Sequence, residues 1–281
     1  MTPKLIQGIE QIADTYDHFI IDVWGVLHDG RNAYPGAADA LRTLKAAGKQ
    51  VLLLSNSPNR ATRVIEKVLG PIGIGPDLYD HILTSGEAAH AHMRDHHAGQ
   101  KVYTFWDEEE STAIDNAGLE RVFEIDAADF IYGSLVPYDA IAVDYDAVLA
   151  RARARDLPMV CGNPDRIVGY GATLHLCVGA LAERYENAGG TVTWIGKPYR
   201  PIYDQARAML GNPDKSRILA IGDGLLTDIA GAANFGCDVV WNVIGIHWDE
   251  VSTKGTIDAA KVERALAGRP APSALMHGFK P

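Results

Sequence analysis

The feature that most constrains the fold is an apolar run that ends in a carboxylate. Residues Phe19 to Ile21 are fully apolar, as is typical of a strand buried in a parallel sheet, and Asp22 follows at once. Burying a carboxylate is unfavourable without a partner, and ligands bind at the carboxyl ends of strands in open α/β sheets. Taken alone, Asp22 is explained more simply as a turn or helix-capping residue, so other stretches must decide.

The same pattern recurs three times further along the chain. Strands are predicted at 51–54, 192–195 and 217–221. Each is followed by polar side chains: Ser55 and Asn56 after the first, Lys197 after the second, and Asp223 with Asp228 after the third. Because the carboxyl ends of parallel strands meet at one edge of a sheet, we expect these side chains to lie close to Asp22.

This set of side chains suits phosphoryl transfer. Asp22 has the chemistry of a nucleophile that forms an aspartyl-phosphate, and Asp22 with Asp223 offers oxygen ligands for Mg²⁺. Lys197 and the metal would neutralise the charge of the phosphate. Ser55 and Asn56 would donate hydrogen bonds to its oxygens. The pattern therefore predicts a metal-assisted phosphate site at this edge of the sheet.

The composition argues against two kinds of partner. The chain has 26 lysine and arginine residues against 36 aspartate and glutamate residues, a net charge of −10, which disfavours nucleic acid. Cys161, Cys177 and Cys237 lack metal-binding spacing and fit reduced thiols of a cytosolic protein. No apolar run is long enough to span a membrane, and the acidic start of the chain does not resemble a signal peptide. We therefore expect a cytoplasmic protein without membrane or nucleic-acid partners.

The spacing of these stretches divides the chain. Ser55 and Lys197 lie 142 residues apart (197 − 55), which leaves room for an inserted domain, whereas Asp22 and Ser55 lie only 33 apart (55 − 22). A second alternation of apolar strands and helices fills the long interval. The predicted domains are a core, residues 1–85 plus 191–281, and an inserted domain, residues 86–190.

Local signals predict smaller features. Residues 1–17 show the periodicity of a short amphipathic helix, and Asp107 with Glu110 has the spacing of a capping box. Simple capping of the next helix by Ser57 or Asn59 explains the polar stretch after residue 54 as well as an anion site does.

Four motifs together resemble one known family. They are Asp22-x-x-Gly25-Val26, a strand ending in Ser55, Gly196-Lys197-Pro198, and Gly222-Asp223-x-x-x-Thr227-Asp228-Ile229. In combination they resemble the haloacid dehalogenase superfamily, most of whose members are Mg²⁺-dependent phosphatases. An insertion between the second and third motifs is similar to the type 2 cap of that family. Within it, two segments resemble the class IIA, p-nitrophenyl phosphatase-like members: Cys161-Gly162-Asn163-Pro164-Asp165 and Gly179-Ala180-Leu181.

The resemblance implies a doubly wound parallel α/β sheet, a Rossmann-like core, with an inserted α/β cap. Catalysis would fall to Asp22, Lys197 and Ser55, and substrate binding to Ser55, Asn56, Lys197 and Asn163. Mg²⁺ would be held by Asp22, Asp223 and the backbone carbonyl of Trp24, with Asp228 orienting the site. The substrate would be a small phosphorylated metabolite. Caps of this class often pair, so a homodimer is compatible with the resemblance. A plain Asn-Pro-Asp turn explains Asn163 and Asp165 equally well.

Trp24 is the one serious departure from the family pattern. Phosphatases that carry these motifs usually have a second aspartate there, which acts as general acid and base. An indole does neither at neutral pH, and losing that help typically costs about 10²–10⁴-fold in rate. Two functions follow: a slow phosphatase that needs good leaving groups, or a ligand-binding or regulatory protein on a phosphatase scaffold.

Several other residues allow two interpretations. His28 and Asp29 lie just beyond Trp24 and would be proton donors, but an exposed turn is the simpler interpretation. The helical spacing of four histidines suggests a metal site, but an exposed helix surface is favoured for them: His90, His92, His96 and His97.

Overall fold

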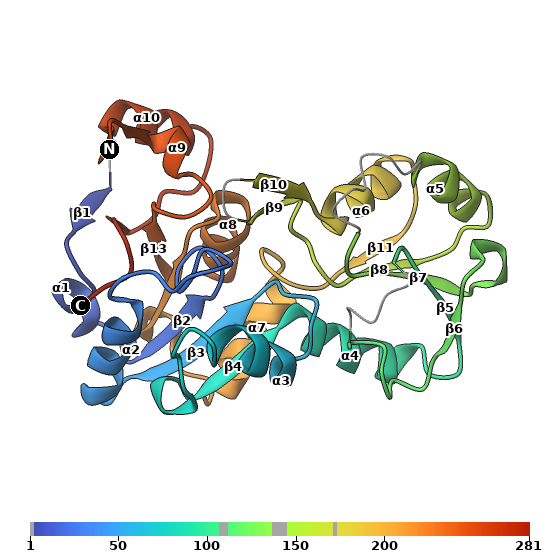
Figure 1. Ribbon diagram of the computed structural model, residues 1–281, viewed down its shortest axis with the longest axis horizontal. Helices are drawn as coiled ribbons and strands as arrows, with labels where there is room; N and C mark the ends of the chain where they lie inside the picture. Colours follow the sequence, from blue (N-terminus) through green and yellow to red (C-terminus); the bar gives the residue numbers. More distant parts are fainter. Residues whose placement is uncertain (1–2, 107–111, 137–144, 171–172) are drawn as a thin grey trace.

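The fold is built around two separate parallel sheets, which form the two halves of the molecule (Figure 1). The computed structural model describes residues 3–106, 112–136, 145–170 and 173–281. The predicted capping box at Asp107 and Glu110 lies outside these ranges. Both chain termini lie in the half that contains the larger sheet.

The larger sheet has seven parallel strands in the order β1-β16-β13-β12-β2-β3-β4. Its strands are β1 (Lys4–Ile6), β2 (His18–Asp22), β3 (Gln50–Ser55), β4 (His81–Thr84), β12 (Ile218–Gly222), β13 (Asp238–Asn242) and β16 (Ala274–Met276). From β2 the chain proceeds in one direction to β3 and β4, and from β12 in the other direction to β13 and β16. The order therefore reverses between β2 and β12, the position where doubly wound sheets bind ligands.

Helices cover both faces of this sheet. They are α1 (Glu10–Ala13), α2 (Ala37–Ala46), α3 (Ala61–Val64), α7 (Arg200–Met209), α8 (Ala230–Phe235), α9 (Trp248–Val251) and α10 (Ala259–Leu266). A wider, π-helical turn extends α3 (Ile65–Leu69), and another precedes α8 (Leu225–Ile229). Short 3₁₀ turns lie at Pro76–Leu78, Ile125–Ala127 and Lys215–Arg217.

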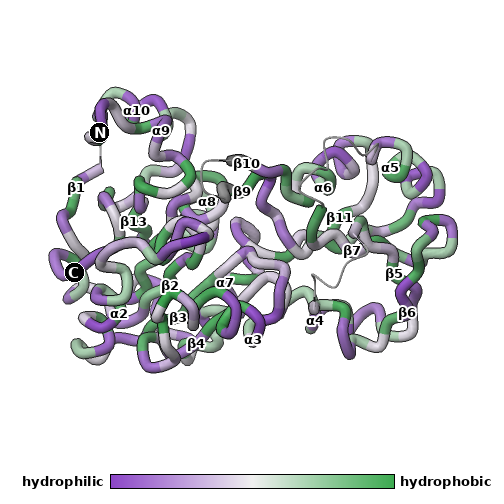
Figure 2. The backbone as a smooth tube through the Cα atoms, viewed as in Figure 1, coloured by the Kyte–Doolittle hydropathy of each residue, from purple (hydrophilic) through white to green (hydrophobic). Residues whose placement is uncertain are grey.

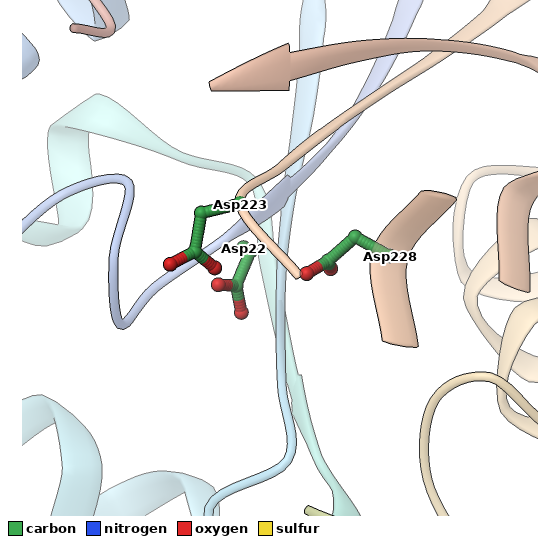
Figure 3. A group of neighbouring side chains, drawn as sticks. All are labelled: Asp22, Asp223 and Asp228. Carbon is green, nitrogen blue, oxygen red and sulfur yellow. The ribbon is translucent and has the colours of Figure 1, made fainter. Parts of the chain in front are cut away.

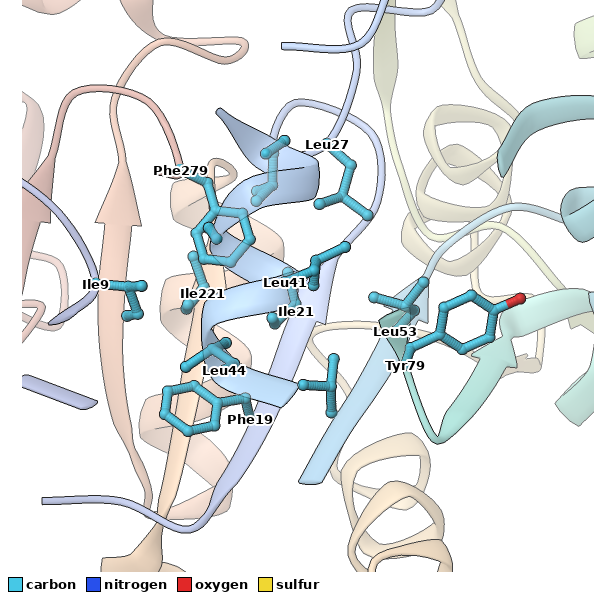
Figure 4. Close-up of a cluster of buried hydrophobic side chains, with 14 of the residues drawn as sticks. Ile9, Phe19, Ile21, Leu27, Leu41, Leu44, Leu53, Tyr79, Ile221 and Phe279 are labelled. Carbon is cyan, nitrogen blue, oxygen red and sulfur yellow. The ribbon is translucent and has the colours of Figure 1, made fainter. Parts of the chain in front are cut away.

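The packing of α2 shows how the core is held together. Leu41 and Leu44 project from its apolar face onto Phe19 and Ile21 of β2 and Ile221 of β12 (Figure 4). All five side chains are buried, and each contributes roughly 1.5–3 kcal/mol by leaving water. The apolar colour along β2 and β3 in Figure 2 reflects this burial on both faces of the sheet. A rigid pair of strands therefore carries Asp22 and Ser55.

The smaller sheet has five parallel strands in the order β11-β8-β7-β5-β6. They are β5 (Lys101–Thr104), β6 (Glu120–Val122), β7 (Phe130–Gly133), β8 (Met159–Cys161) and β11 (Val192–Trp194). The helices of this half are α4 (Ser85–His96), α5 (Tyr145–Ala154) and α6 (Val178–Asn187). Two antiparallel hairpins complete the fold, β9 (Ile167–Tyr170) with β10 (Thr173–Leu176), and β14 (Ser252–Thr253) with β15 (Thr256–Ile257).

The structure confirms the predicted α/β class and most of the predicted strands, with three corrections. The start of the chain is not one helix, because β1 pairs with β16 near the other end and leaves only the short α1. The hairpin of β9 and β10 and the helix α6 were not expected, although Val178, Leu181 and Tyr185 of α6 have the spacing of a buried helix face. Finally, β11 pairs with β8, so the smaller sheet extends past the predicted boundary at residue 190 to Trp194. We propose residues 86–194 as the cap domain.

Among the described residues, no helix combines the length and apolar character needed to cross a bilayer.

Candidate active site

Three neighbouring strands bring the predicted acidic residues together. Asp22 ends β2, Ser55 ends the adjacent β3, and Asp223 follows β12 on the other side of β2. Asp228 lies in the turn that precedes α8. Figure 3 shows the carboxylates of Asp22 and Asp223 facing each other, with Asp228 extending toward them from its turn. The three residues are buried, and one oxygen from each lies within 4.8 Å of the others.

Lys197 reaches the same place by a different route from the one predicted. Its preceding strand, β11, belongs to the smaller sheet, so Lys197 does not lie at a strand end of the core. The residue as a whole is only 3% exposed. Nζ donates to Asp22 Oδ1 (2.5 Å), Asp228 Oδ1 (2.8 Å) and the Leu54 carbonyl (3.2 Å). All three ammonium hydrogens are therefore engaged, and the cation is fixed beside Asp22.

The charges in this cluster do not balance. Burial alone would lower the pKa of Lys197, but the carboxylates of Asp22 and Asp228 outweigh it and raise that pKa well above its usual value. Burial raises the pKa of Asp22, and Asp228 and Asp223 raise it further against the opposing effect of Lys197. Three buried carboxylates thus share one ammonium group. The excess negative charge suits a bound cation.

Asp223 sits in a space that two glycines leave open. A Cβ atom added at Gly25 would lie 2.0 Å from Asp223 Oδ2, and one added at Gly245 would lie 1.9 Å from the same oxygen. That oxygen accepts the backbone N–H of Ile246 at 2.7 Å, and the Asp223 carbonyl accepts Trp241 Nε1–H at 2.9 Å. Burial, and then the Asp228 carboxylate, raise the pKa of Asp223 to about 7. The position of this carboxyl is therefore fixed, and its ionisation is sensitive to a nearby cation.

Asp228 uses both of its carboxylate oxygens within the protein. Oδ1 accepts from Lys197, and Oδ2 accepts from the backbone N–H of Gly224 at 3.1 Å and the hydroxyl of Thr227 at 3.3 Å. Its geometry is that of a residue that orients Lys197 and the turn around it.

Asn56 and Ser55 were both expected to donate hydrogen bonds to a phosphate. The structure contradicts this for Asn56, whereas the Ser55 hydroxyl can still donate. One Asn56 Nδ2 hydrogen goes to Asp165 Oδ1 (2.8 Å) and the other to the Lys197 carbonyl (3.0 Å), while Oδ1 accepts Lys197 N–H (2.7 Å). The side chain has no hydrogen left for a phosphate. Ser55 Oγ accepts the N–H of Ser57 at 3.1 Å, and no described residue accepts the hydrogen of its own hydroxyl.

The cap loop meets the core through Asp165 rather than through Asn163. The Asn163 side chain is buried, and its Oδ1 accepts the backbone N–H of Asp165 at 3.2 Å, closing an Asn-Pro-Asp turn. The carbonyl of Asn163 also accepts the Cys161 thiol at 3.4 Å. Asn163 thus shapes the loop, and Asp165 makes the contact to Asn56.

Trp24 packs in the loop after β2 and is only half-buried. Its ring lies 4.9 Å from the ring of His28, and a Cβ added at Gly30 would come within 2.5 Å of Trp24 Cζ2. His28 is 2% exposed, which contradicts the predicted exposed turn. Its Nδ1 accepts the N–H of Gly30 at 2.9 Å, and burial lowers the pKa of His28 to about 4. The imidazole is therefore neutral at physiological pH.

Other candidate residues have local roles. Asp29 Oδ1 accepts the N–H groups of Arg31 and Asn32 at 2.8 and 2.7 Å, as expected for a turn. His90 is buried, with Nδ1 2.9 Å from the Ala113 carbonyl oxygen, so the surface prediction was wrong for this residue. In the described ranges the only candidate metal group is the aspartate trio, which leaves out His92, His96 and His97.

Asn242 is a site residue that the sequence did not reveal. It ends β13, is fully buried, and its Nδ2 donates to the Gly25 carbonyl at 2.9 Å. Its Oδ1 accepts the N–H of Gly278 at 3.1 Å. Asn242 thereby holds the loop that carries Trp24 and Gly25. The signal was present, because an asparagine closes an otherwise apolar strand.

The sequence matches known proteins over nearly its whole length. The family model described as haloacid dehalogenase-like hydrolase matches residues 19–120, and a second, HAD-hydrolase-like, matches residues 194–264. The crystal structure of a haloacid dehalogenase-like hydrolase from Brucella suis 1330 is 33% identical, with a TM-score of 0.83, and the alignment covers 98% of this chain and 99% of that one.

Two curated relatives come from Bacillus subtilis. 5'-Nucleotidase YutF is 28% identical over 80% of this chain and 86% of its own length. Sugar-phosphatase AraL is 26% identical over 77% of this chain and 79% of its own length. Together with the parallel core sheet, the inserted second sheet and the cluster around Asp22, these similarities show that the chain belongs to the haloacid dehalogenase-like hydrolases.

Proposed function

We propose that this hydrolase is a Mg²⁺-dependent phosphatase of small phosphomonoesters, with Asp22 as its nucleophile. The observation that carries the proposal is the buried cluster in which Lys197 contacts Asp22 and Asp228 while Asp223 lies beside them. Two relatives that are named as a nucleotidase and a sugar-phosphatase support a small phosphorylated substrate.

The residues present fit a divalent cation. No described residue donates a hydrogen bond to Asp22 Oδ2 or Asp223 Oδ1, so both oxygens are available as ligands. The backbone carbonyl of Trp24, on the loop between them, would be the third protein ligand. When bound, the metal supplies positive charge that offsets the charge of the phosphate and of the transition state.

Each side chain then has a definite task. Asp22 attacks the phosphorus atom, the bond to the leaving oxygen breaks, and water later hydrolyses the aspartyl-phosphate. Lys197 holds the attacking carboxylate in place and adds positive charge beside it. The hydroxyl of Ser55 donates to a phosphate oxygen, and Asp228 keeps the ammonium group of Lys197 in position.

A panel of phosphate esters, assayed for phosphate release with Mg²⁺ and with a chelator, tests the proposal. The Asp22→Asn variant serves as the blank, and Asp39→Asn, at an exposed carboxylate on α2, serves as the matched control. We expect Mg²⁺-dependent release by the wild type and the control but not by the blank. Acid-quenched wild type should also carry one phosphoryl group on Asp22.

The alternative function is a ligand-binding or regulatory protein, and it is favoured by Trp24 occupying the position of the usual acid. It predicts that phosphate esters raise the melting temperature without being hydrolysed. Release no faster than that of Asp22→Asn on every ester would overturn the phosphatase proposal in favour of this alternative.

A further inference from the structure

The proposed phosphatase reaction needs a source of protons that Trp24 does not provide. The leaving oxygen of an alkyl phosphate must gain a proton as its bond to phosphorus breaks. His28 is neutral, and its Nδ1 is occupied by the N–H of Gly30. Asp29 holds its own turn through Oδ1. The nearest side chains in the loop after β2 therefore leave this role unfilled.

Asp165 approaches the site from the cap. Its Oδ1 accepts Asn56 Nδ2–H at 2.8 Å, and the Asn56 side chain also makes two hydrogen bonds to the backbone of Lys197. Lys197 in turn contacts Asp22. Asp165, a residue of the cap, is thus linked to the nucleophile through two residues.

The backbone of Asp165 is firmly held. Its N–H donates to Asn163 Oδ1 at 3.2 Å, and its carbonyl accepts the N–H of Gly179 at 3.1 Å. A Cβ added at Gly179 would lie 2.5 Å from that carbonyl oxygen, so α6 begins in close contact with the loop. A carboxyl on such a support keeps its position relative to the core whenever the cap contacts Asn56.

The second carboxyl oxygen of Asp165 remains available. No hydrogen bond from the described part of the chain reaches Oδ2. The residue as a whole is half-buried. One oxygen therefore fixes the side chain to Asn56, while the other accepts no hydrogen bond from a described residue.

The charged groups around Asp165 favour a proton on it. Burial raises the pKa of Asp165 and Asp228 raises it too, whereas the Asn56 hydrogen bond and the Lys197 charge lower it, and the net direction is upward. Asp165 itself contributes to the raised pKa of Asp223. The thiols of Cys161 and Cys177, which also face it, have raised pKa values because of burial and stay neutral.

We propose that Asp165 is the general acid and base of this enzyme, in place of the aspartate that Trp24 replaces. This inference rests on the proposed phosphatase function. As Asp22 bonds to phosphorus and the bond to the leaving oxygen breaks, the Asp165 carboxyl gives its proton to that oxygen. The Asp165 carboxylate then takes a proton from the water that attacks phosphorus. The bond between phosphorus and Asp22 breaks, inorganic phosphate leaves, and both carboxyl groups return to their starting states.

Asp165→Asn tests the proposal cleanly because the amide oxygen can still accept from Asn56. Asp156→Asn, at an exposed cap carboxylate beyond α5, is the matched control. The substrates are p-nitrophenyl phosphate, phenyl phosphate and glycerol phosphate, in order of poorer leaving groups. We expect kcat/KM of Asp165→Asn to fall about 10²–10⁴-fold for glycerol phosphate and only a few-fold for p-nitrophenyl phosphate. The basic limb of the pH profile should disappear with glycerol phosphate.

The outcomes distinguish this inference from the proposed function. An equal loss on all three esters would make Asp165 a positioning residue that acts through Asn56, and a wild type that cleaves only aryl phosphates would show that no acid operates. Either result overturns the inference and leaves the phosphatase proposal standing. No hydrolysis of any ester overturns both. Adding Trp24→Asp to Asp165→Asn should restore glycerol phosphate turnover, compared at equal folded fraction.

Discussion

Replacing Lys197 by methionine should destabilise the protein far more than replacing any exposed lysine. Methionine has a similar length but no charge, so the buried carboxylates of Asp22 and Asp228 lose the group that contacts both, at 2.5 and 2.8 Å. The Leu54 carbonyl loses its hydrogen bond as well. Water cannot replace the ammonium group easily, because the lysine side chain is only 4% exposed.

The size of the effect follows from this burial. Removing one partner of a buried ion pair leaves an uncompensated charge and typically costs about 3–5 kcal/mol. For a chain of this size, this free energy corresponds to a fall of roughly 6–20 °C in melting temperature. Lys45 provides the comparison, because it bridges Asp80 at 2.6 Å but is 26% exposed, and such pairs contribute about 0–1 kcal/mol.

The assay is thermal and urea unfolding in the presence of a chelator, with Lys197→Met and Lys45→Met measured side by side. Adding Asp228→Asn to Lys197→Met should recover part of the lost stability, because it removes one of the two buried carboxylates that are left without the ammonium group. The free energies of unfolding of the two lysine variants could instead differ by no more than about 1 kcal/mol, the range of a surface ion pair. That result would show that the cluster of Lys197, Asp22 and Asp228 is not a buried, desolvated ion pair network.

Three further predictions follow from the site and the loop beside it. Millimolar Mg²⁺ should raise the melting temperature of the wild type, and Asp223→Asn should abolish the rise; an unchanged wild-type curve would count against the metal site. In the Asp165→Asn background, Trp24→Asp should accelerate hydrolysis of alkyl phosphates more than aryl phosphates, while losing up to about 3–5 kcal/mol of stability with the indole; no gain on any ester at equal folded fraction would contradict it. His28, whose pKa is lowered from 6.5 to about 4 by burial, contributes stability that is complete above pH 6.5 and lost as pH falls through 4, about 3 kcal/mol in all. His28→Asn, which can still accept the Gly30 N–H, should flatten this part of the stability–pH curve, and an unaltered acid limb would refute the assignment.

The carboxylates of the site could be predicted because their signal is local. An apolar strand that ends in Asp22, and another that ends before Asp223, define both the element and the position of the side chain at its end. The three-residue strands β1 and β16 gave no such signal. They exist because distant parts of the chain pair with each other, which no short window of sequence contains.

Asn56 shows where residue type alone misleads. Its amide at the end of β3 suits a phosphate, yet its partners come from Asp165 and Lys197, 109 and 141 residues away. Lys197 was placed correctly for the wrong reason, since its strand lies in the other sheet. His28 looked like a surface turn, yet it is buried and its ring lies beside that of Trp24. In each case the decisive contact is made in three dimensions.

The route by which Lys197 reaches the core also has a consequence for biosynthesis. Asp22 and Lys197 are 175 residues apart in sequence, and the whole cap lies between them. On the ribosome, β2 and β3 emerge long before the cation that neutralises Asp22. Until the cap has been translated and the chain has returned through β11, that carboxylate must stay hydrated or protonated. Burying Asp22 as a carboxylate is therefore unfavourable in the nascent core, and the cluster is completed only after the insertion and the residues through Asp228 are made.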